Sequence, residues 1–180
     1  HIAKWREGRD ALLCSTRFVD ECYARIEALE GREPVLLRFG NMRAGTVRNA
    51  IASEAEVHGS LRTFSVQDRQ AGKEAIRASA RQAARLTGCE ASVHFSQGNP
   101  PVTNDERLFR LVRDAIDDLR EVDAPLLIAE DFAWYQQQLP GVFLLLGTGT
   151  GTPLHADTFD FDESILQVGV NAYRRLVMQA

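Results

Sequence analysis

The residues best suited to chemistry lie between Gly147 and Glu163. A loop of alternating glycine and threonine ends in Pro153-Leu-His155, and an acidic run through Glu163 then opens an apolar-periodic segment. An imidazole held at the end of such a loop can bind a metal ion or move a proton. Because no second ligand lies within helical or hairpin reach, His155 is either an ordinary loop histidine or one member of a site completed from elsewhere.

The composition is that of an ordinary globular protein and argues against several partners. The 180 residues are 44% hydrophobic and 26% charged, which allows one good core or two modest ones. The net charge of -4 argues against nucleic-acid and anionic-membrane partners. No apolar run approaches the roughly 20 residues that span a bilayer. We therefore expect a cytoplasmic protein without such partners.

The three cysteines are odd in number and lack CxxC spacing. This pattern favours buried free thiols in a reducing compartment over a disulfide framework or a zinc site.

Helical and strand patterns alternate through the first half of the chain. Apolar spacing predicts helices over about 8–29 and 67–86, and strands over 34–39, 54–64 and 90–96. The order is helix, strand, strand, helix, strand, which becomes the split βαβ sandwich of ferredoxin-like type with one strand added before the first helix. In the second strand, strict alternation places four residues on one face, namely Ala55, Val57, Gly59 and Leu61.

A second region follows a break at Gln97-Gly-Asn-Pro-Pro101. Thr103-Asn-Asp-Glu106 has the pattern of a capping box. The run 142–146 is fully apolar and is typical of a buried parallel strand. With few strands of its own, this region looks incomplete. The elements expected here are helices over about 103–119, from 130, and over 162–178, and strands over 125–128 and 142–146.

Six motifs in consistent order and spacing carry a resemblance to a known family. They are His1-Ile-Ala-Lys-Trp-Arg-Glu-Gly8-Arg-Asp10, Gly45-Thr-Val-Arg-Asn49, Gly59-Ser-Leu-Arg62-Thr-Phe64, Asn99-Pro-Pro-Val-Thr-Asn104, Ala129-Glu-Asp-Phe-Ala-Trp-Tyr135 and Leu154-His155-Ala-Asp-Thr-Phe-Asp-Phe-Asp-Glu163. The chain resembles the M20 family of metallopeptidases and amidohydrolases, in particular its aminoacylase, carboxypeptidase and N-acetyl-diaminopimelate deacetylase branch. Trp5 and Arg6 stand where the family usually has Pro-His, and Ala52 stands where proline is usual.

The resemblance implies a division into two domains. Residues 1–98 correspond to a ferredoxin-like α+β lid domain that mediates dimerisation and lacks its first strand here. Residues 99–180 correspond to the C-terminal segment of an α/β zinc-peptidase-type catalytic domain. The remaining metal ligands and the glutamate general base would lie outside these residues. We therefore expect a fragment that forms a homodimer through the lid and is inactive alone.

The resemblance also implies roles for particular residues. His155 corresponds to the last ligand of a site for two divalent metal ions, zinc by preference, with manganese or cobalt as alternatives. Asp157 and Asp160 would orient the imidazole, although Asp160 or Asp162 would equally serve as a cap for the following helix.

The lid would contribute residues that contact the substrate. His1 matches a lid histidine that stabilises the tetrahedral oxyanion, often in the partner's active site. Asn49 and Arg62 match residues that hold the substrate carboxylate or the oxyanion. The competing interpretations are a terminal histidine without a role, a turn asparagine and a solvated arginine. Glu130 and Asp131, at a predicted helix start, are read as a cap and not as a general base.

The expected function is that of a metal-dependent amidohydrolase that cleaves the amide bond of small N-acyl amino acids or dipeptides. Two alternatives stay open. The chain could be a dimerisation or ligand-binding module, or a degenerate homologue that binds such ligands without cleaving them.

Overall fold

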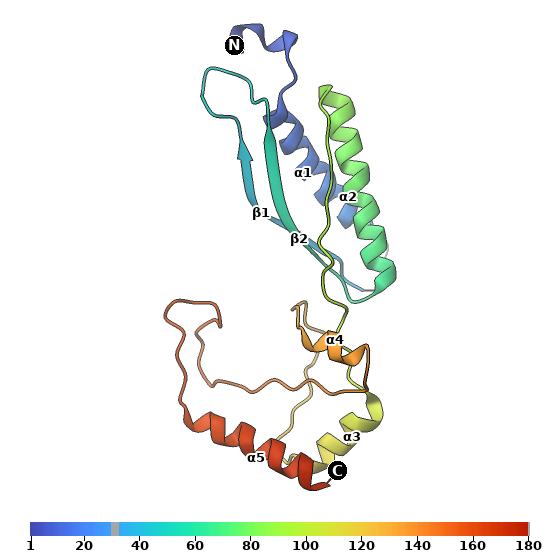
Figure 1. Cartoon of the computed structure of the whole chain (residues 1–180), viewed down its shortest axis with the longest axis vertical. Helices are drawn as coiled ribbons and strands as arrows, with labels where there is room; N and C mark the ends of the chain where they lie inside the picture. The colour runs from blue at the N-terminus through green and yellow to red at the C-terminus, as the bar shows by residue number, and fades with distance from the viewer. Residues whose placement is uncertain (30–32, 180) are drawn as a thin grey trace. The chain divides into compact units, whose positions relative to one another are not determined.

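The computed structural model describes residues 1–29 and 33–179, which divide into two compact units (Figure 1). Unit 1 comprises His1–Pro101 together with Leu126–Ala129. Unit 2 comprises Val102–Pro125 and Glu130–Ala180. Each unit has its own internal packing and is described separately.

Unit 1 consists of helices packed on a sheet. Its elements are η1 (Ile2–Glu7), α1 (Ala11–Glu27), β1 (Leu36–Ala44), β2 (Ala55–Arg62) and α2 (Val66–Thr87). The two long helices lie side by side against one face of the antiparallel strand pair (Figure 1). The mixed α/β class expected from the sequence is confirmed.

The helices of unit 1 begin and end where local chemistry dictates. Asp10 caps α1 by accepting a hydrogen bond from the Leu13 amide at 3.1 Å. Ser65 caps α2 by accepting from the Asp68 amide at 2.9 Å, and its hydroxyl donates to the Asp68 carboxylate at 2.7 Å. Gly88 ends α2 in the left-handed region with a φ of 70°, where glycine is favoured because it has no Cβ. These local signals explain why both helices were predictable.

The sheet of the described residues has two strands with one irregularity. β1 and β2 run antiparallel from the pair Leu36 and Arg62, and the register shifts at Gly40, which forms a β-bulge between Phe39 and Asn41. Because of this bulge, β1 continues past residue 39, where the sequence predicted its end. It stays paired with β2 as far as Ala44.

Two of the four residues predicted to share the inner face of β2 are half-buried, and Ala55 and Gly59 are exposed. Val57 and Leu61 are half-buried, while the residues between them are exposed. A side chain could not replace Gly59 without movement, because a Cβ there would lie 2.6 Å from the Phe39 ring. β2 therefore turns its apolar face toward the helices.

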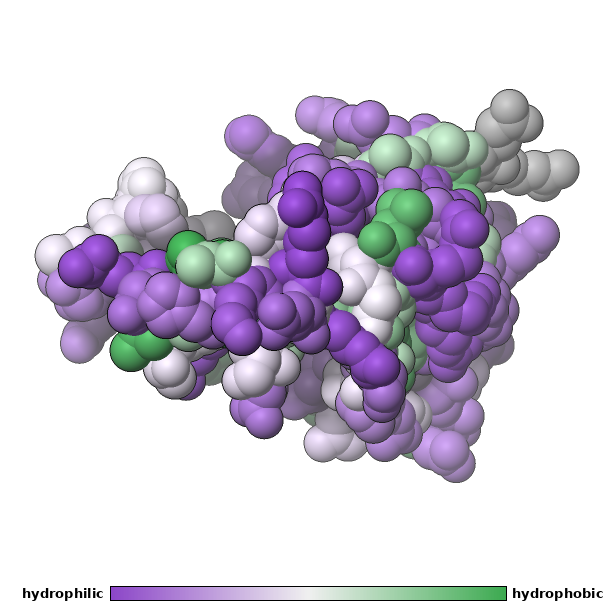
Figure 2. Space-filling model, turned by 90° about the horizontal axis from the view of Figure 1, so that it is seen from above, coloured by the Kyte–Doolittle hydropathy of each residue, from purple (hydrophilic) through white to green (hydrophobic). Residues whose placement is uncertain are grey.

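The core of unit 1 lies between the sheet and the helices. Leu37 is 2% exposed and Cys22 is fully buried, and both belong to a cluster with Ile26, Ala75 and Ile76. Aromatic rings close its edge, since Phe18 meets Phe39 edge-on with the ring centroids 5.4 Å apart. On the face seen in Figure 2, hydrophilic residues separate the hydrophobic ones, so no broad apolar patch marks a docking surface there.

Residues 90–96 do not form the strand that their pattern predicts. Val93 and Phe95 do pack against the core cluster, as the alternation required. The segment makes no ladder with β2, however, and a pocket lies between the two. Apolar alternation therefore indicated which side chains face inward. It could not supply the neighbouring strand that ladder hydrogen bonds need.

Unit 2 contains the helices α3 (Glu106–Ala115), α4 (Phe132–Gln136) and α5 (Ser164–Gln179). The predicted capping box is wrong by two residues, because Asp105 and not Thr103 caps α3 by accepting from the Leu108 amide at 2.9 Å. α3 also ends earlier than predicted, at an extended Ile116. Arg175 of α5 forms an ion pair of 2.7 Å with Asp117, just after α3.

The two strands predicted for the second region, 125–128 and 142–146, are absent as well. The buried-strand interpretation of 142–146 is wrong, because Leu145 is 56% exposed and Leu146 is also exposed. A parallel strand is buried only between neighbours, and no neighbouring strand exists among the described residues of unit 2. On α5, apolar side chains are exposed as well, among them Leu166, Tyr173 and Val177.

Burial of Cys22 predicts a fall in stability at alkaline pH. Burial raises the pKa of its thiol from 9.0 to about 11, although contact with Ser79 opposes this. Below pH 9 the thiol is protonated in both the folded and the unfolded state. Between pH 9 and about 11 only the unfolded state releases the proton, so the unfolding free energy falls as pH rises. Urea titrations across this range should show a smaller fall for Cys22→Ala, and an unchanged slope would contradict the assignment.

Candidate active site

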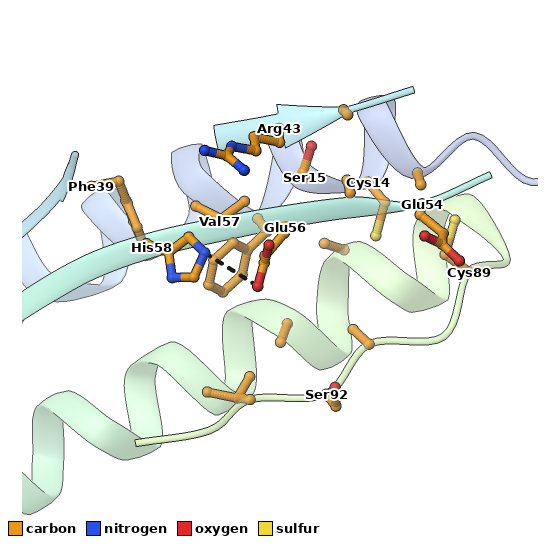
Figure 3. Close-up of a pocket in the computed structure, with 18 of the residues that line it drawn as sticks. Cys14, Ser15, Phe39, Arg43, Glu54, Glu56, Val57, His58, Cys89 and Ser92 are labelled. Carbon is orange, nitrogen blue, oxygen red and sulfur yellow. Dashed lines mark ion pairs between the residues drawn. The ribbon is translucent and has the colours of Figure 1, made fainter. Parts of the chain in front are cut away.

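Unit 1 contains a groove of about 1000 Å³ along the free side of β2 (Figure 3). Residues 54–59, in β2 and just before it, form one wall, and residues 89–95 form the other. Side chains of α1 and α2 form the floor, among them Phe18 and Ile76. None of the four residues predicted to act in the site, His1, Asn49, Arg62 and His155, lines this pocket.

The titratable side chains of this pocket do not form a catalytic set. His58 Nε2 lies 3.2 Å from Glu56 Oε1 at the exposed rim (Figure 3). An exposed imidazole beside a solvated carboxylate is not by itself a catalytic set. His58 is therefore a solvent-exposed histidine beside an exposed carboxylate.

His1 and Asn49 are brought together by the loop that connects β1 and β2. The Ile2 amide donates to the Asn49 carbonyl at 3.1 Å, which joins η1 to this loop. The His1 Nδ1 atom accepts a hydrogen bond from the Ala3 amide at 3.2 Å. An accepting Nδ1 places the proton of the neutral ring on Nε2. The exposed ring therefore presents a hydrogen-bond donor, which is the chemistry that an oxyanion requires.

The departures from the family pattern lie beside this junction. Arg6 lies over the Trp5 ring at 5.0 Å, and both side chains are exposed. Ala52 is buried, and its carbonyl accepts from the Ala11 amide at 2.9 Å. The loop is thus held at the start of α1 without the usual proline, while Trp5 and Arg6 give the surface near His1 an aromatic and cationic character.

Arg62 ends β2 and is neither buried nor freely solvated. Its Nη1 atom donates to the Leu127 carbonyl at 2.7 Å, which attaches residues 126–129 to unit 1. A guanidinium has five N–H donors, so one main-chain contact leaves others for a carboxylate. The hydrogen bond to the Leu127 carbonyl therefore orients the Arg62 side chain, and the sequence did not predict this contact.

His155 lies in the other unit, in an exposed loop made of successive turns. The Ala156 amide donates to the Pro153 carbonyl at 3.0 Å, and the Phe159 amide donates to the Ala156 carbonyl at 3.0 Å. These turns fix the main chain on both sides of the imidazole, which itself faces solvent.

The acidic residues after His155 serve the local main chain. Asp160 accepts from the Phe161 amide at 2.8 Å, and Asp162 accepts from the Ser164 amide at 2.9 Å at the start of α5. This hydrogen bond from Ser164 lowers the pKa of Asp162. Asp162 is therefore best described by the alternative prediction, in which its carboxylate caps the start of α5. At Asp131, the first residue before α4, the side chain makes no capping hydrogen bond.

The described residues supply one candidate ligand for a metal ion. His155 offers one exposed ring nitrogen, a donor suited to zinc. Among residues 1–29 and 33–179, no group of three or more His, Cys, Asp or Glu could hold a metal ion. His155 therefore fits as one ligand of a site, and a complete site needs further donors.

Two amide side chains that sequence reasoning did not single out organise unit 2. Asn104 pairs with the main chain of Phe143, accepting from its amide at 2.8 Å and donating to its carbonyl at 3.2 Å. Gln136 pairs in the same way with Thr103, at 3.0 and 2.9 Å. Asn104 lay in a recognised motif, but its role became visible only when residue 143 was placed beside it.

Comparison with known proteins agrees with these motifs. Residues 10–179 match the profile of peptidase family M20/M25/M40. An uncharacterized hydrolase of Staphylococcus haemolyticus is 33% identical over 160 residues, covering 83% of this chain and 42% of that protein. A similar hydrolase of Staphylococcus epidermidis is 33% identical over 159 residues, with the same coverage of 83% and 42%.

Two solved structures share the fold. A dinuclear metal-binding peptidase of the M20 family from Bacillus subtilis superposes with a TM-score of 0.75 and 26% identity, covering 93% of this chain and 45% of that one. A protein described as an aminohydrolase from methicillin-resistant Staphylococcus aureus gives a TM-score of 0.80 at 19% identity, covering 99% and 48%.

The fold and the profile together define a mixed α/β protein of the M20 peptidase type. The chain belongs to peptidase family M20/M25/M40, which confirms the resemblance. It spans less than half the length of the relatives that it matches. No helix in the described part of the chain is long and apolar enough to cross a membrane.

Proposed function

We propose that these residues are part of a cytoplasmic, metal-dependent amidohydrolase that cleaves the amide bond of small N-acyl amino acids or dipeptides. The observation that carries the proposal is the match of residues 10–179 to a peptidase family. The likeness to a dinuclear metal-binding peptidase of Bacillus subtilis supports two metal ions. The ions would be zinc by preference, with manganese or cobalt as alternatives. When bound, such ions supply Lewis-acid polarisation of the amide carbonyl and a water of lowered pKa.

The chain's own residues would then bind and orient the substrate. His155 would donate a ring nitrogen to one of the ions. His1, with its ring proton on Nε2, would donate to the carbonyl oxygen as negative charge develops there, and Asn49 would assist from the adjoining loop. Arg62, oriented by the Leu127 carbonyl, would hold the carboxylate of the substrate with its remaining donors.

We also propose that residues 1–98 form the lid and dimerisation domain and that 99–180 form the C-terminal segment of the catalytic domain. The pocket beside β2 supports this division. It has a strand edge on one side, the unpaired segment 89–95 on the other, and an apolar floor. One more strand in that space would give both walls ladder partners and complete the lid sheet.

Hydrolysis by the complete enzyme that contains these residues is the direct test. Release of free amino acid from a panel of N-acetyl amino acids and dipeptides should be lost with a chelator and restored by zinc, manganese or cobalt. The isolated 180-residue chain should neither turn over substrate nor retain stoichiometric metal. Turnover with tight stoichiometric metal in the isolated chain would overturn the claim that ligands lie elsewhere.

The substitutions at Trp5 and Arg6 favour one second candidate. A homologue that binds N-acyl amino acids without cleaving them would keep Arg62 for the substrate carboxylate. It would lack the arrangement of residues around His1 that stabilises the oxyanion. Calorimetric binding of these ligands to the complete protein, without any release of amino acid, would favour that candidate.

The role of Arg62 predicts a selective effect on substrate binding. In the complete enzyme, Arg62→Lys should raise KM for N-acyl amino acids by roughly tenfold and change kcat little, because an ammonium cannot grip a carboxylate bidentately. Neutral amide analogues of the same substrates should show no such change. Arg81→Lys, at an exposed position of α2, serves as the matched control. An equal loss for charged and neutral substrates would contradict the assignment.

A further inference from the structure

Two of the three cysteines meet at one end of the pocket beside β2. Cys14 comes from α1 and Cys89 from the segment just after α2, and both line the pocket, with their side chains at its same end (Figure 3). The side chains of Thr87 and Cys89 are near enough to the Cys14 thiol to influence its pKa. Cys14 is only 8% exposed, whereas Cys89 is partly exposed.

The Arg9 side chain, just before α1, lies near the residues on both sides of Cys89. Gly88 turns the chain directly after α2 and lies against Arg9, whose Cγ would be 4.0 Å from a Cβ at position 88. Arg9 Nη1 also lies 3.3 Å from Glu90 Oε1. Each contact is modest in strength, but together they flank Cys89 on both sides. The start of α1 and the residues that follow α2 are therefore adjacent without any disulfide.

We propose that Cys14 and Cys89 are a reversible oxidation site, in which hydrogen peroxide converts the two thiols into an intramolecular disulfide. Peroxide oxidises the accessible Cys89 thiol to a sulfenic acid and is reduced to water. The Cys14 sulfur then attacks the Cys89 sulfur, the S–O bond breaks, and the hydroxyl leaves as a second water with the proton from Cys14. Two thiols and one peroxide thus give one disulfide and two waters.

The order of the steps follows from exposure and charge. Cys89 meets the oxidant first because it is the more exposed of the two. Burial raises the pKa of Cys14, so less of its reactive thiolate exists at neutral pH. Ring closure should therefore become faster as the pH rises. The disulfide would join α1 to the end of α2 and should raise the melting temperature by constraining the unfolded chain.

The tryptic digest of this chain separates the three thiols cleanly. Trypsin cleaves after lysine and arginine, which places Cys14 in residues 10–17, Cys22 in 18–25 and Cys89 in 86–107. Mass spectrometry of the peroxide-treated full chain, digested without reductant, therefore identifies any pairing directly. We expect the peptide 10–17 linked to 86–107, the loss of two thiols per chain, and recovery of both with dithiothreitol.

Matched variants distinguish the pair from general thiol oxidation. Cys22→Ser should leave the cross-link intact, because Cys22 lies in the core cluster. In Cys14→Ser the cross-link should disappear and a dimedone adduct should accumulate on Cys89. Circular dichroism shows whether each variant is folded, and the mapping in the unsubstituted chain needs no variant. A cross-link to Cys22, disulfides only between chains, or irreversible oxidation of Cys89 without a cross-link would each overturn the proposal.

Discussion

Replacing His155 by alanine in the complete enzyme should lower kcat/KM by roughly 10³-fold, because the site would lose the ion that polarises the substrate carbonyl. Metal analysis of the dialysed protein should show a loss of about one of the two proposed ions. The residue is exposed and fixed by turns at Pro153 and Ala156, so the substitution removes a donor without leaving a cavity. Stability measured by urea unfolding should therefore change little.

His94→Ala is the matched control for this variant. His94 is also an exposed histidine, but it lies in the segment 90–96 and in no recognised motif. The His94→Ala variant should therefore retain both metal and activity. If His155→Ala kept its full metal content and its rate, the assignment of His155 as a ligand would be wrong, whatever the fate of the His94 variant.

Replacing Leu37 by alanine should destabilise unit 1 by roughly 3 kcal/mol, the usual cost of a cavity in a packed core. Leu37 is 2% exposed and belongs to the cluster with Cys22, Ile26 and Ile76. Because this core lies between two strands and two helices, few neighbours can collapse into the space. Urea unfolding followed by circular dichroism should show a lower midpoint, and hydrogen exchange should quicken in α1, α2 and β1 together.

Val66→Ala provides the comparison at a surface position. Val66 is the first residue of α2 and is 74% exposed, so its truncation should change stability by less than about 0.5 kcal/mol. Equal effects of the two substitutions would show that the cluster around Leu37 is not the core of unit 1.

The helices of this protein were predictable because their signals are local. Asp10, Ser65 and Gly88 sit within one turn of the helix ends that they define, and each acts through a hydrogen bond or a main-chain angle of its own segment. The exception is α3, where Thr103 and Asp105 both had the composition of a cap. Only the observed hydrogen bond to Leu108 selected Asp105.

The strands were harder to predict because a strand is a property of a pair. Residues 55–62 found a partner in β1 and formed the expected strand, whereas 90–96 and 142–146 had the right apolar pattern and found none among the described residues. In the second case the amide of Asn104 takes the main-chain bonds of Phe143 that a neighbouring strand would otherwise take. A pattern of side chains carries no information about which backbone will lie alongside it.

The sequence by itself determined the family, the helices and the residues that match its motifs, because these depend on residue identity and on spacing along the chain. Only the tertiary structure decided that η1 meets the loop of Asn49, that Arg62 is oriented by Leu127, and that Cys14 and Cys89 line the same end of a pocket. Each of these pairs joins residues that are distant in the chain. Such contacts follow from packing a whole unit around its core, and no local preference encodes them.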